Sequence, residues 1–330
     1  MIFVLITLLV GSIIAAVHYA EVIAHKLGEP YGTLVLAVSV TVIEVALIVA
    51  MMLSGSDGAA YIARDAVFAA IMIVVNGVVG LCIFIGGLNH RELGFRIEGP
   101  NSAIAVLAAL ATLTLVLPVF TISSPGPTFT VSQLAFAGVS SLVLYGAFIF
   151  FQTVSHRDYF LPHQSDLKTN AEAHAEPPSR NKTIWSAVLL FIALIFVVGL
   201  AKALSPSIEA GVKALGAPKT IVGIVIAALV LMPESVAALR AARANRLQTS
   251  FNLALGSALA SIGLTIPTVA IISIYFGLPL SLGIGPVNMV LLILTLFVGL
   301  ITLALGKTTI LQGIVHLIIF FTYLFISLIP

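Results

Sequence analysis

Ten apolar stretches, each of roughly the 20 residues needed to cross a lipid bilayer, constrain this chain more than any other feature. A bilayer offers no hydrogen-bond partners to an open backbone, so stretches of this length are expected to be helices. Short polar turns such as "SGSDG" and "SSPGP" separate them. The sequence therefore predicts an all-α polytopic membrane protein with about ten transmembrane helices. They are expected over residues 2–24, 31–53, 63–88, 101–121, 129–152, 183–204, 218–240, 248–276, 287–305 and 308–329.

The composition excludes a water-soluble fold. Of the 330 residues, 60% are hydrophobic and 8% are charged, whereas a soluble domain has about 25% charged residues. With a net charge of +2 and so little charged surface, no binding of nucleic acid is expected. Cys82 is the one cysteine, which excludes a disulfide within the chain. The first residues, "MIFVLITLLVGSIIAAV", lack the basic start of a signal peptide and are expected to remain as a helix.

One long polar stretch divides the predicted helices into five and five. The expected organisation is a first five-helix repeat in 1–152, a polar linker in 153–182 and a second five-helix repeat in 183–330. Because five is an odd number, the second half must start on the opposite side of the membrane from the first. Two related halves then form an inverted repeat, a common architecture of transporters.

The distribution of lysine and arginine predicts the orientation. The odd-numbered connections between helices, the linker included, carry 11 of the 15 basic residues, and the even-numbered connections carry four. Cytoplasmic loops of membrane proteins are enriched in these residues, so the linker is expected to be cytoplasmic and both termini to face outward. An additional helix upstream of these residues would account for an outward start without a signal.

Two carboxylates stand out against the apolar background. Glu44 in "TVIEVALIVAMML" and Glu234 in "ALVLMPESVAAL" are the two of 13 acidic residues expected to lie deep, while the others, Asp65 included, are expected near helix ends or in loops. A carboxylate at mid-bilayer costs about 3 kcal/mol. Each lies in the second helix of its half, so they occupy matching places. We expect both to face the bundle interior and to bind a cation, a proton or each in turn. A permanently protonated structural acid is the alternative.

Polar side chains on neighbouring helix faces extend this candidate site. Thr41 shares a helix face with Glu44. Pro233 removes a helix hydrogen bond directly before Glu234, and carbonyls freed in this way can coordinate cations. Glycine and alanine beside the polar residues are as typical of close helix packing as of ion contact. The further candidate ligands are amides and hydroxyls in small-residue helices of both halves: Asn76, Asn252, Ser257 and Ser261. His316, inside the last predicted helix, is expected to be a hydrogen-bonded packing residue rather than a proton relay.

Two long segments carry a resemblance to a known family. "GEPYGTLVLAVSVTVIEVALIVAMML" and "LVLMPESVAALRAARANRLQTSFNLALGSALASIGLTIP" resemble the two signature regions of the cation/proton exchangers in the calcium/cation antiporter superfamily. The resemblance covers nearly the whole chain and is nearest to the bacterial calcium/proton antiporters. It implies two inverted five-helix repeats, placed in the bacterial inner membrane. It also implies that Glu44 and Glu234 bind the cation and carry the counter-transported protons.

The chain departs from the family pattern at amide positions. Pro233 stands where many members have an asparagine, and Ser261 takes the place of the asparagine in the family's "GS…N" pattern. Fewer amide ligands leave sodium and potassium open beside calcium.

The predicted function is secondary antiport that exports a cation, calcium first and sodium or potassium next, in exchange for protons. Glu44 and Glu234 are the expected metal ligands, no cofactor is expected, and the partners are the cation, protons and lipid. A passive cation channel is the main alternative. An intramembrane enzyme is disfavoured, because the sequence has no recognisable nucleophile, metal cluster or phosphate motif. A purely structural protein leaves the two deep carboxylates unexplained.

Overall fold

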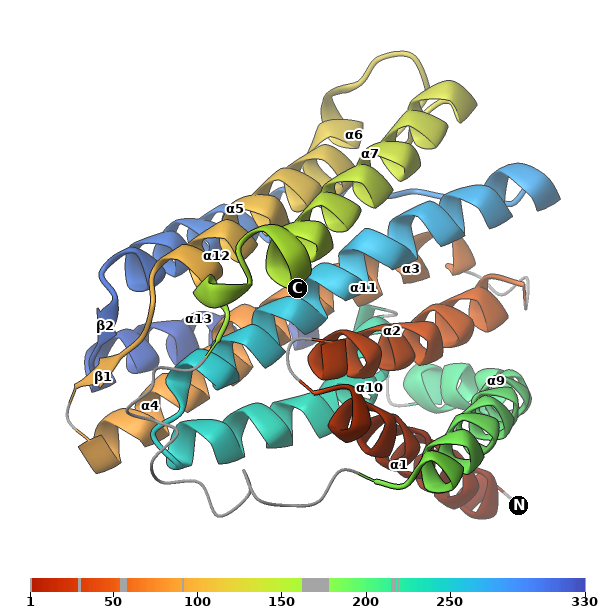
Figure 1. The fold of residues 1–330 in the computed structure, drawn as a ribbon. Helices are drawn as coiled ribbons and strands as arrows, with labels where there is room; N and C mark the ends of the chain where they lie inside the picture. The colour runs from red at the N-terminus through yellow and green to blue at the C-terminus, as the bar shows by residue number, and fades with distance from the viewer. Residues whose placement is uncertain are drawn as a thin grey trace.

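The computed structural model describes residues 2–28, 31–53, 58–90, 92–161, 178–214, 218 and 220–329, and almost all of them are helical (Figure 1). The segments of the first half are α1 (Ile2–Leu27), α2 (Tyr31–Met52), α3 (Ala59–Ile71), η1 (Met72–Val78), α4 (Val79–His90), β1 (Leu93–Gly94), α5 (Glu98–Ala111), η2 (Thr112–Val116), α6 (Leu117–Phe120), α7 (Val131–Phe150), η3 (Phe151–Ser155) and η4 (Arg157–Tyr159). Those of the second half are α9 (Arg180–Ala214), α10 (Thr220–Arg243), α11 (Leu247–Phe276), α12 (Pro286–Ala304), β2 (Lys307–Thr308) and α13 (Ile310–Leu328).

The helices have the length and composition of membrane spans. Within the described residues, eight are long and apolar enough to cross a bilayer, a ninth span is formed by the two bent parts of α10, and residues 37–52 of α2 form a shorter apolar helix. The prediction of an all-helical membrane protein with about ten helices is confirmed. Helix bounds differ in places: α9 extends ten residues beyond the predicted end at 204, and α3 begins at Ala59 rather than at 63.

Three spans contain stretches of π-helix. The segment η1 continues α3 into α4, η2 lies between α5 and α6, and η3 extends α7. Such wide turns place an extra residue in the helix and are frequent at functional sites.

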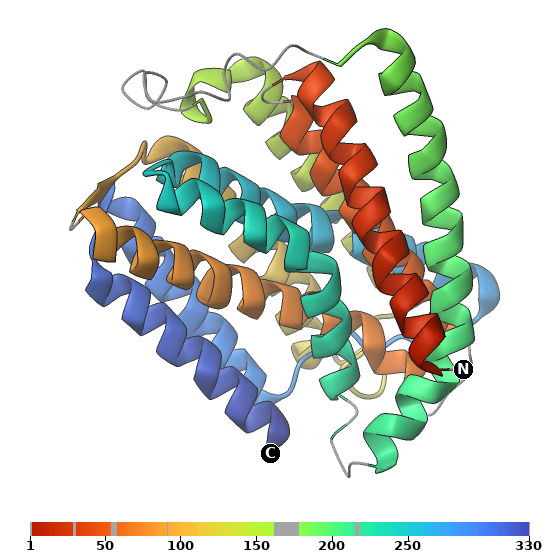
Figure 2. The same ribbon diagram turned by 90° about the horizontal axis from the view of Figure 1, so that it is seen from below.

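The helix α10 is bent where Pro233 interrupts its backbone hydrogen bonds. Its two parts, Thr220–Met232 and Glu234–Arg243, meet at 53°. The bend is visible in the teal helix of Figure 2. Proline removes one hydrogen bond from a helix and clashes with the carbonyl four residues before it, which is a sufficient cause for a bend of this size. Glu234 is the first residue after the bend.

The two halves pack in a matched, interleaved way. In the first half α2 lies against α11 of the second half, and in return α10 lies against α3. In the same way α7 packs on α11, and α13 packs on α4. The helices α1 and α9 lie side by side at the edge of the bundle, as Figures 1 and 2 both show. This reciprocal pattern is the one that an inverted repeat produces.

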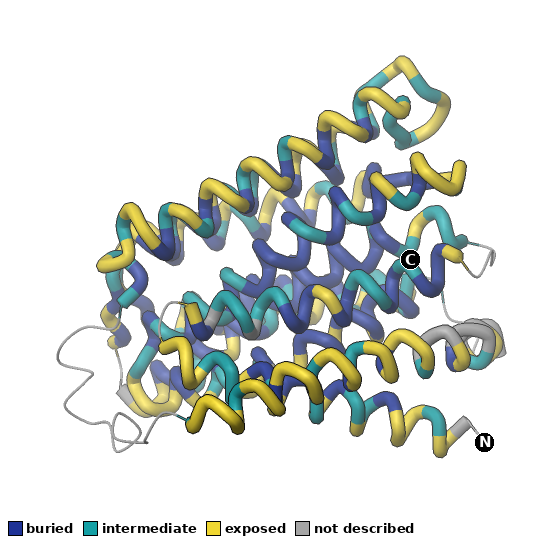
Figure 3. The backbone as a smooth tube through the Cα atoms, turned by 45° about the vertical axis from the view of Figure 1, so that its right-hand side comes forward, coloured by how far each residue is buried: buried dark blue, intermediate teal, exposed yellow. Residues whose placement is uncertain are grey.

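The buried part of the bundle is formed by four spans: α2, α3 with η1 and α4, α10, and α11. Their residues form most of the dark blue centre in Figure 3, while the surrounding helices expose apolar side chains outward. Examples of this exposed ring are Phe191 on α9, Phe297 on α12 and Phe321 on α13, each about 60% exposed or more. An apolar exterior of this kind is suited to lipid rather than water.

Hydrogen bonds gather the odd-numbered connections on one face, here called the linker face. The strands β1 and β2 pair there as an antiparallel ladder, which joins the third connection to the ninth. Gln248, at the start of α11, accepts from the backbone N–H of Arg96 at 2.8 Å and donates to the carbonyl of Tyr159 at 3.3 Å. The linker therefore begins on the same face as the connection before α11.

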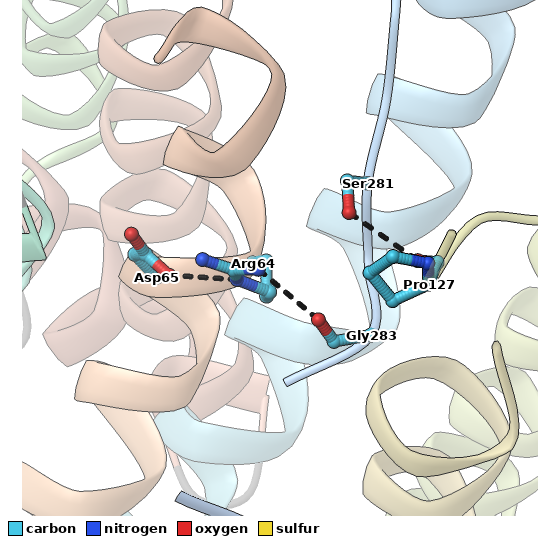
Figure 4. A network of polar contacts seen from close by, with 5 residues as sticks. All are labelled: Arg64, Asp65, Pro127, Ser281 and Gly283. Carbon is cyan, nitrogen blue, oxygen red and sulfur yellow. Dashed lines mark hydrogen bonds and ion pairs between the residues drawn. The ribbon is translucent and has the colours of Figure 1, made fainter. Parts of the chain in front are cut away.

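The second, fourth and eighth connections meet on the opposite face. Arg64 donates to the carboxylate of Asp65 at 2.8 Å and to the carbonyl of Gly283 at 3.1 Å, and Ser281 donates to the carbonyl of Pro127 (Figure 4). The expectation that Asp65 lies at a helix end needs correction. Because α3 begins earlier than predicted, Asp65 is buried on its second turn, where Arg64 compensates its charge.

Candidate functional site

Glu44 is held in the centre of the bundle by a hydroxyl from the other half. Its side chain is 1% exposed, and its Oε1 accepts a hydrogen bond of 2.6 Å from the Oγ of Ser261. This bond joins α2 to α11. The structure thus brings these two predicted site residues into direct contact.

Glu234 is equally buried and has no comparable partner. Its side chain is 3% exposed, and within the described residues neither carboxylate oxygen has a hydrogen-bond partner. The hydroxyl of Ser257 faces it without completing a hydrogen bond of normal geometry, and the charge of Glu44 is close enough to act on it. An unpaired buried carboxylate is costly, so this group requires a proton or a cation.

The difference between the two acids follows from the helices that face them. Glu44 lies against α11, whose "GSALAS" run supplies the hydroxyl of Ser261 that bonds to it. Glu234 lies on α10, which packs against α11 and α3. On α11 Ser257 faces it without a hydrogen bond of normal geometry, and on α3 the run 66–75, "AVFAAIMIVV", contains no polar side chain. The site is therefore asymmetric although the helices that build it are matched.

A small cavity adjoins Glu234. Its volume of about 10 Å³ matches about one water molecule. Tyr145, on the α7 wall, is 6% exposed, and within the described residues its hydroxyl has no partner. The lining residues are Leu34, Ala37, Tyr145, Phe148, Ile149, Gln152, Glu234, Asn252, Leu253 and Gly256.

Asn252 lines this cavity, but its amide is bonded to the linker face. Its Nδ2 donates to the carbonyl of Phe160 at 2.5 Å, and its Oδ1 accepts from Gln248 at 3.3 Å. Phe160 is 3% exposed and packs edge-on against Phe148. The start of the linker thus contacts two residues that line the cavity, Phe148 and Asn252.

The other two predicted ligands are placed less favourably. Thr41 is buried beside Glu44, but its hydroxyl donates to the carbonyl of Ala37 in its own helix at 2.8 Å. Asn76 is not brought to the carboxylates. The geometry therefore gives no support to Asn76 as a cation ligand, and Thr41 offers only its remaining lone pair.

Asn76 belongs to a separate buried network. Its Nδ2 donates to Thr295 at 2.8 Å, and its Oδ1 accepts from Nδ1 of His316 at 3.1 Å. The other ring nitrogen of His316 is bonded to Thr302 at 3.1 Å. His316 is hydrogen-bonded at both nitrogens, as predicted, and the network joins η1 to α12 and α13.

Sequence reasoning missed Tyr145 and Gln152. They lie seven residues apart on α7 and η3, a spacing that puts both on one helix face. This pair of polar groups in an apolar helix was the available signal. It was not decisive, because α7 carries no acid, and the sequence does not show that this face meets Glu234.

Ser261→Ala is expected to destabilise the protein. A buried carboxyl group that loses its hydrogen-bond donor costs about 1–3 kcal/mol. We expect a lower melting temperature in detergent at constant pH and ionic composition. Ser141→Ala is the matched control, because Ser141 is equally buried and donates only to Ala137 of its own helix. An equal loss in both variants would mean that the bond to Glu44 adds nothing.

Two inverted five-helix units that enclose a pair of buried carboxylates define a secondary ion transporter rather than an enzyme. The chain belongs to the sodium/calcium exchanger protein family, whose profile matches residues 1–154 and 185–329. Its relatives support its place in the cation/proton exchanger branch, and it is an integral membrane protein.

Two named relatives match nearly the whole chain, and a third matches part of it. A putative ionic transporter, y4hA of Sinorhizobium fredii, is 51% identical over 98% of this chain and 87% of its own length. The sodium-potassium/proton antiporter ChaA of Escherichia coli is 34% identical over 96% of this chain and 85% of its own length. The Ca²⁺/H⁺ antiporter ChaA of Bacillus subtilis is 25% identical over 60% of this chain and 56% of its own length.

Solved structures share the fold. Native YfkE superposes with a TM-score of 0.75 at 17% identity, over 98% of this chain and 90% of that one. The H⁺/Ca²⁺ exchanger CAX gives a TM-score of 0.69 at 17% identity, over 97% of this chain and 82% of that one. At these identities the likeness concerns the fold alone.

Proposed function

We propose that this chain is a cation/proton antiporter in which Glu44 and Glu234 bind cation and proton alternately. The observation that carries the proposal is the burial of two carboxylates, one from each half, close enough to interact. Within the described residues, the two acids together accept one hydrogen bond, from Ser261 to Glu44. Two buried negative charges cannot both remain uncompensated. They need either protons or cations, and an alternation between the two is an exchange cycle.

The cycle runs as follows. On the side where the cation enters, both glutamates lose their protons and bind it together. After the opposite opening, the cation leaves and protons return to the carboxylates. A divalent cation balances both charges by itself, and a monovalent cation balances them together with one retained proton.

Sodium and potassium are the first candidates for the cation, with calcium next. The relative with 34% identity is named for sodium and potassium, while the calcium/proton antiporter from Bacillus subtilis is less similar and matches less of the chain. The replacement of the expected asparagine by Ser261 supports this order, because calcium takes six to eight oxygen ligands and this site offers few beyond its carboxylates. This order, sodium and potassium before calcium, is the reverse of the order expected from the sequence.

We also propose the bacterial inner membrane as the location, with the linker face toward the cytoplasm. The excess of lysine and arginine in the odd-numbered connections supports this orientation. The division into 1–152, 153–182 and 183–330 stays a prediction, supported by the two stretches that the family profile matches.

Reconstituted vesicles with an imposed proton gradient and a pH-sensitive dye test the function. Sodium, potassium and calcium chloride are added separately, with choline chloride as the osmotic control. Wild-type protein is expected to collapse the gradient on addition of sodium or potassium. The dependence of the initial rate on cation concentration then ranks the ions.

The outcomes separate the alternatives. A response to calcium alone restores the order expected from the sequence. A passive channel is distinguished by clamping the membrane potential at zero with valinomycin and equal potassium on both sides, with sodium or calcium as the added cation. Proton movement coupled to that cation persists in an antiporter and disappears in a cation channel. No response to any of the three ions, in folded protein, overturns the proposal.

A further inference from the structure

We propose that Tyr145 and Gln152, with Asn252, form a waiting site for a cation beside Glu234, on the linker-face side of the carboxylate pair. The inference rests on the proposed function and adds a third wall to its site. The two signature glutamates come from α2 and α10, and the hydroxyls come from α11. The wall proposed here comes from α7 and η3, which the sequence prediction left out of the site.

The helix geometry aims this wall at Glu234. Tyr145, Ile149 and Gln152 succeed one another at spacings of four and three, so they share one face of the span, and all three line the cavity. Close packing of α7 against α11 holds this face next to the site. Gly263 on α11 lies against Tyr145, where an added Cβ would stand 2.7 Å from the Cβ of Tyr145.

The polar groups of this wall are buried without partners. Gln152 is 6% exposed, and within the part of the chain that the structure describes its amide forms no hydrogen bond. The hydroxyl of Tyr145 and both oxygens of Glu234 are likewise unpartnered there. Buried polar groups are ordinarily hydrogen-bonded, so the unpaired hydroxyl of Tyr145 and the unpaired carboxylate of Glu234 at one cavity indicate a ligand.

The chemistry of the lining identifies the class of ligand. A side-chain carbonyl from Gln152, a phenol oxygen from Tyr145 and a carboxylate from Glu234 are oxygen donors, which suit sodium, potassium and calcium. The cavity matches about one water molecule in volume, which gives room for one ion stripped of its hydration shell. Gln152 thus supplies an amide oxygen, of the kind lost from the family pattern at Ser261, from a different helix.

The position suggests its place in the cycle. Asn252 lies in the second turn of α11, near the linker face, and Gln152 lies where α7 becomes η3 on its way to that face. Phe160 lies next to the cavity lining there, with its carbonyl bonded to Asn252 and its ring against Phe148. A cation arriving from the linker face therefore meets the amides of Asn252 and Gln152 before it meets Glu234.

Cation-dependent stabilisation of the purified protein tests this inference without transport. The melting temperature is followed against sodium, potassium and calcium concentration at constant ionic strength, and the concentration dependence gives the affinity. Gln152→Leu is expected to weaken binding of the preferred ion about tenfold, as loss of a hydrogen-bonding group toward a charge predicts. Tyr145→Phe is expected to weaken it at least threefold.

Thr153→Val is the matched control. Thr153 is the next residue on η3, is similarly buried, and its hydroxyl donates to the carbonyl of Ile149 in its own helix. Its affinity for the ion is expected to stay within twofold of wild type. Gln152→Met serves as a second variant of similar length if Gln152→Leu does not fold.

Unchanged affinity in both folded Gln152 variants would overturn the waiting site. If wild-type protein binds an ion but moves no protons in vesicles, the proposed antiport fails. The ratio of ion affinities between wild type and the Gln152 variants still decides whether Gln152 binds the ion. If wild-type protein binds none of the three ions, both proposals fall.

Discussion

Glu234→Gln is expected to abolish cation-driven proton movement and, at the same time, to raise the melting temperature. The substitution removes a buried charge that no hydrogen bond supports within the described residues, while the size of the side chain is kept. In cation-free buffer the gain corresponds to about 1–3 kcal/mol. It should be largest at alkaline pH, where the wild-type carboxylate is deprotonated, and should shrink as acid protonates it. Vesicle assays and thermal unfolding across pH measure the two effects.

Glu44→Gln provides the contrast that makes this prediction specific. It should also abolish proton movement, but with little gain in stability, because Ser261 already donates to the wild-type carboxylate. Glu92→Gln is the control for acid removal, since Glu92 is exposed on the linker face and paired only loosely with Lys307 at 3.7 Å. Near-normal transport in Glu44→Gln would mean that Glu44 is a structural acid. A melting temperature for Glu234→Gln that is unchanged at every pH would mean that its charge is compensated.

Gly313→Ala is expected to produce a large loss of stability for so small a change. A Cβ at Gly313 would stand 2.7 Å from the backbone N of Phe84 and 3.0 Å from the carbonyl oxygen of Gly80. These are backbone atoms, so α13 must move away from α4, at a cost of about 1–3 kcal/mol. The same displacement stretches the bond between His316 and Asn76. Thermal unfolding in detergent measures the loss.

Gly146→Ala is the matched control. Gly146 is also inside a transmembrane helix, but an added Cβ meets nothing within 4 Å. Alanine is the better helix former by up to about 1 kcal/mol, so this variant should be as stable as wild type or more stable. Equal losses in both variants would show that the close contact of α4 and α13 does not limit stability.

Much of this fold was accessible from the sequence, because the bilayer imposes one length and one conformation on each apolar stretch. Because successive helices cross the membrane in opposite directions, odd-numbered and even-numbered connections must lie on opposite faces. The hydrogen bonds of Gln248 join connections on the first face, and those of Arg64 join connections on the second. The helix starts were less predictable. Asp65 appeared terminal because Arg64 and the preceding polar turn resembled a membrane boundary, whereas the two charges neutralise each other inside α3.

The candidate site was predictable only in part, for a related reason. Carboxylates in an apolar run are conspicuous, so Glu44 and Glu234 were found, and Ser261 followed from its helix. A neutral amide gives a weaker signal, and its partners depend on helix rotation. Asn76 is bonded to His316, while Gln152, at the end of a helix without acids, lines the same cavity as Glu234.

The hydrogen bond between Glu44 and Ser261 also has a consequence for biosynthesis. Its two residues are 217 positions apart in the chain. At common rates of translation, roughly 10–40 s pass between the synthesis of one and the other. During that interval α2 is in the membrane before α11 has been synthesised, so Glu44 has no hydrogen bond from Ser261. The nascent first half must therefore hold Glu44 in the protonated form, or shelter it within the insertion machinery, until the second half arrives.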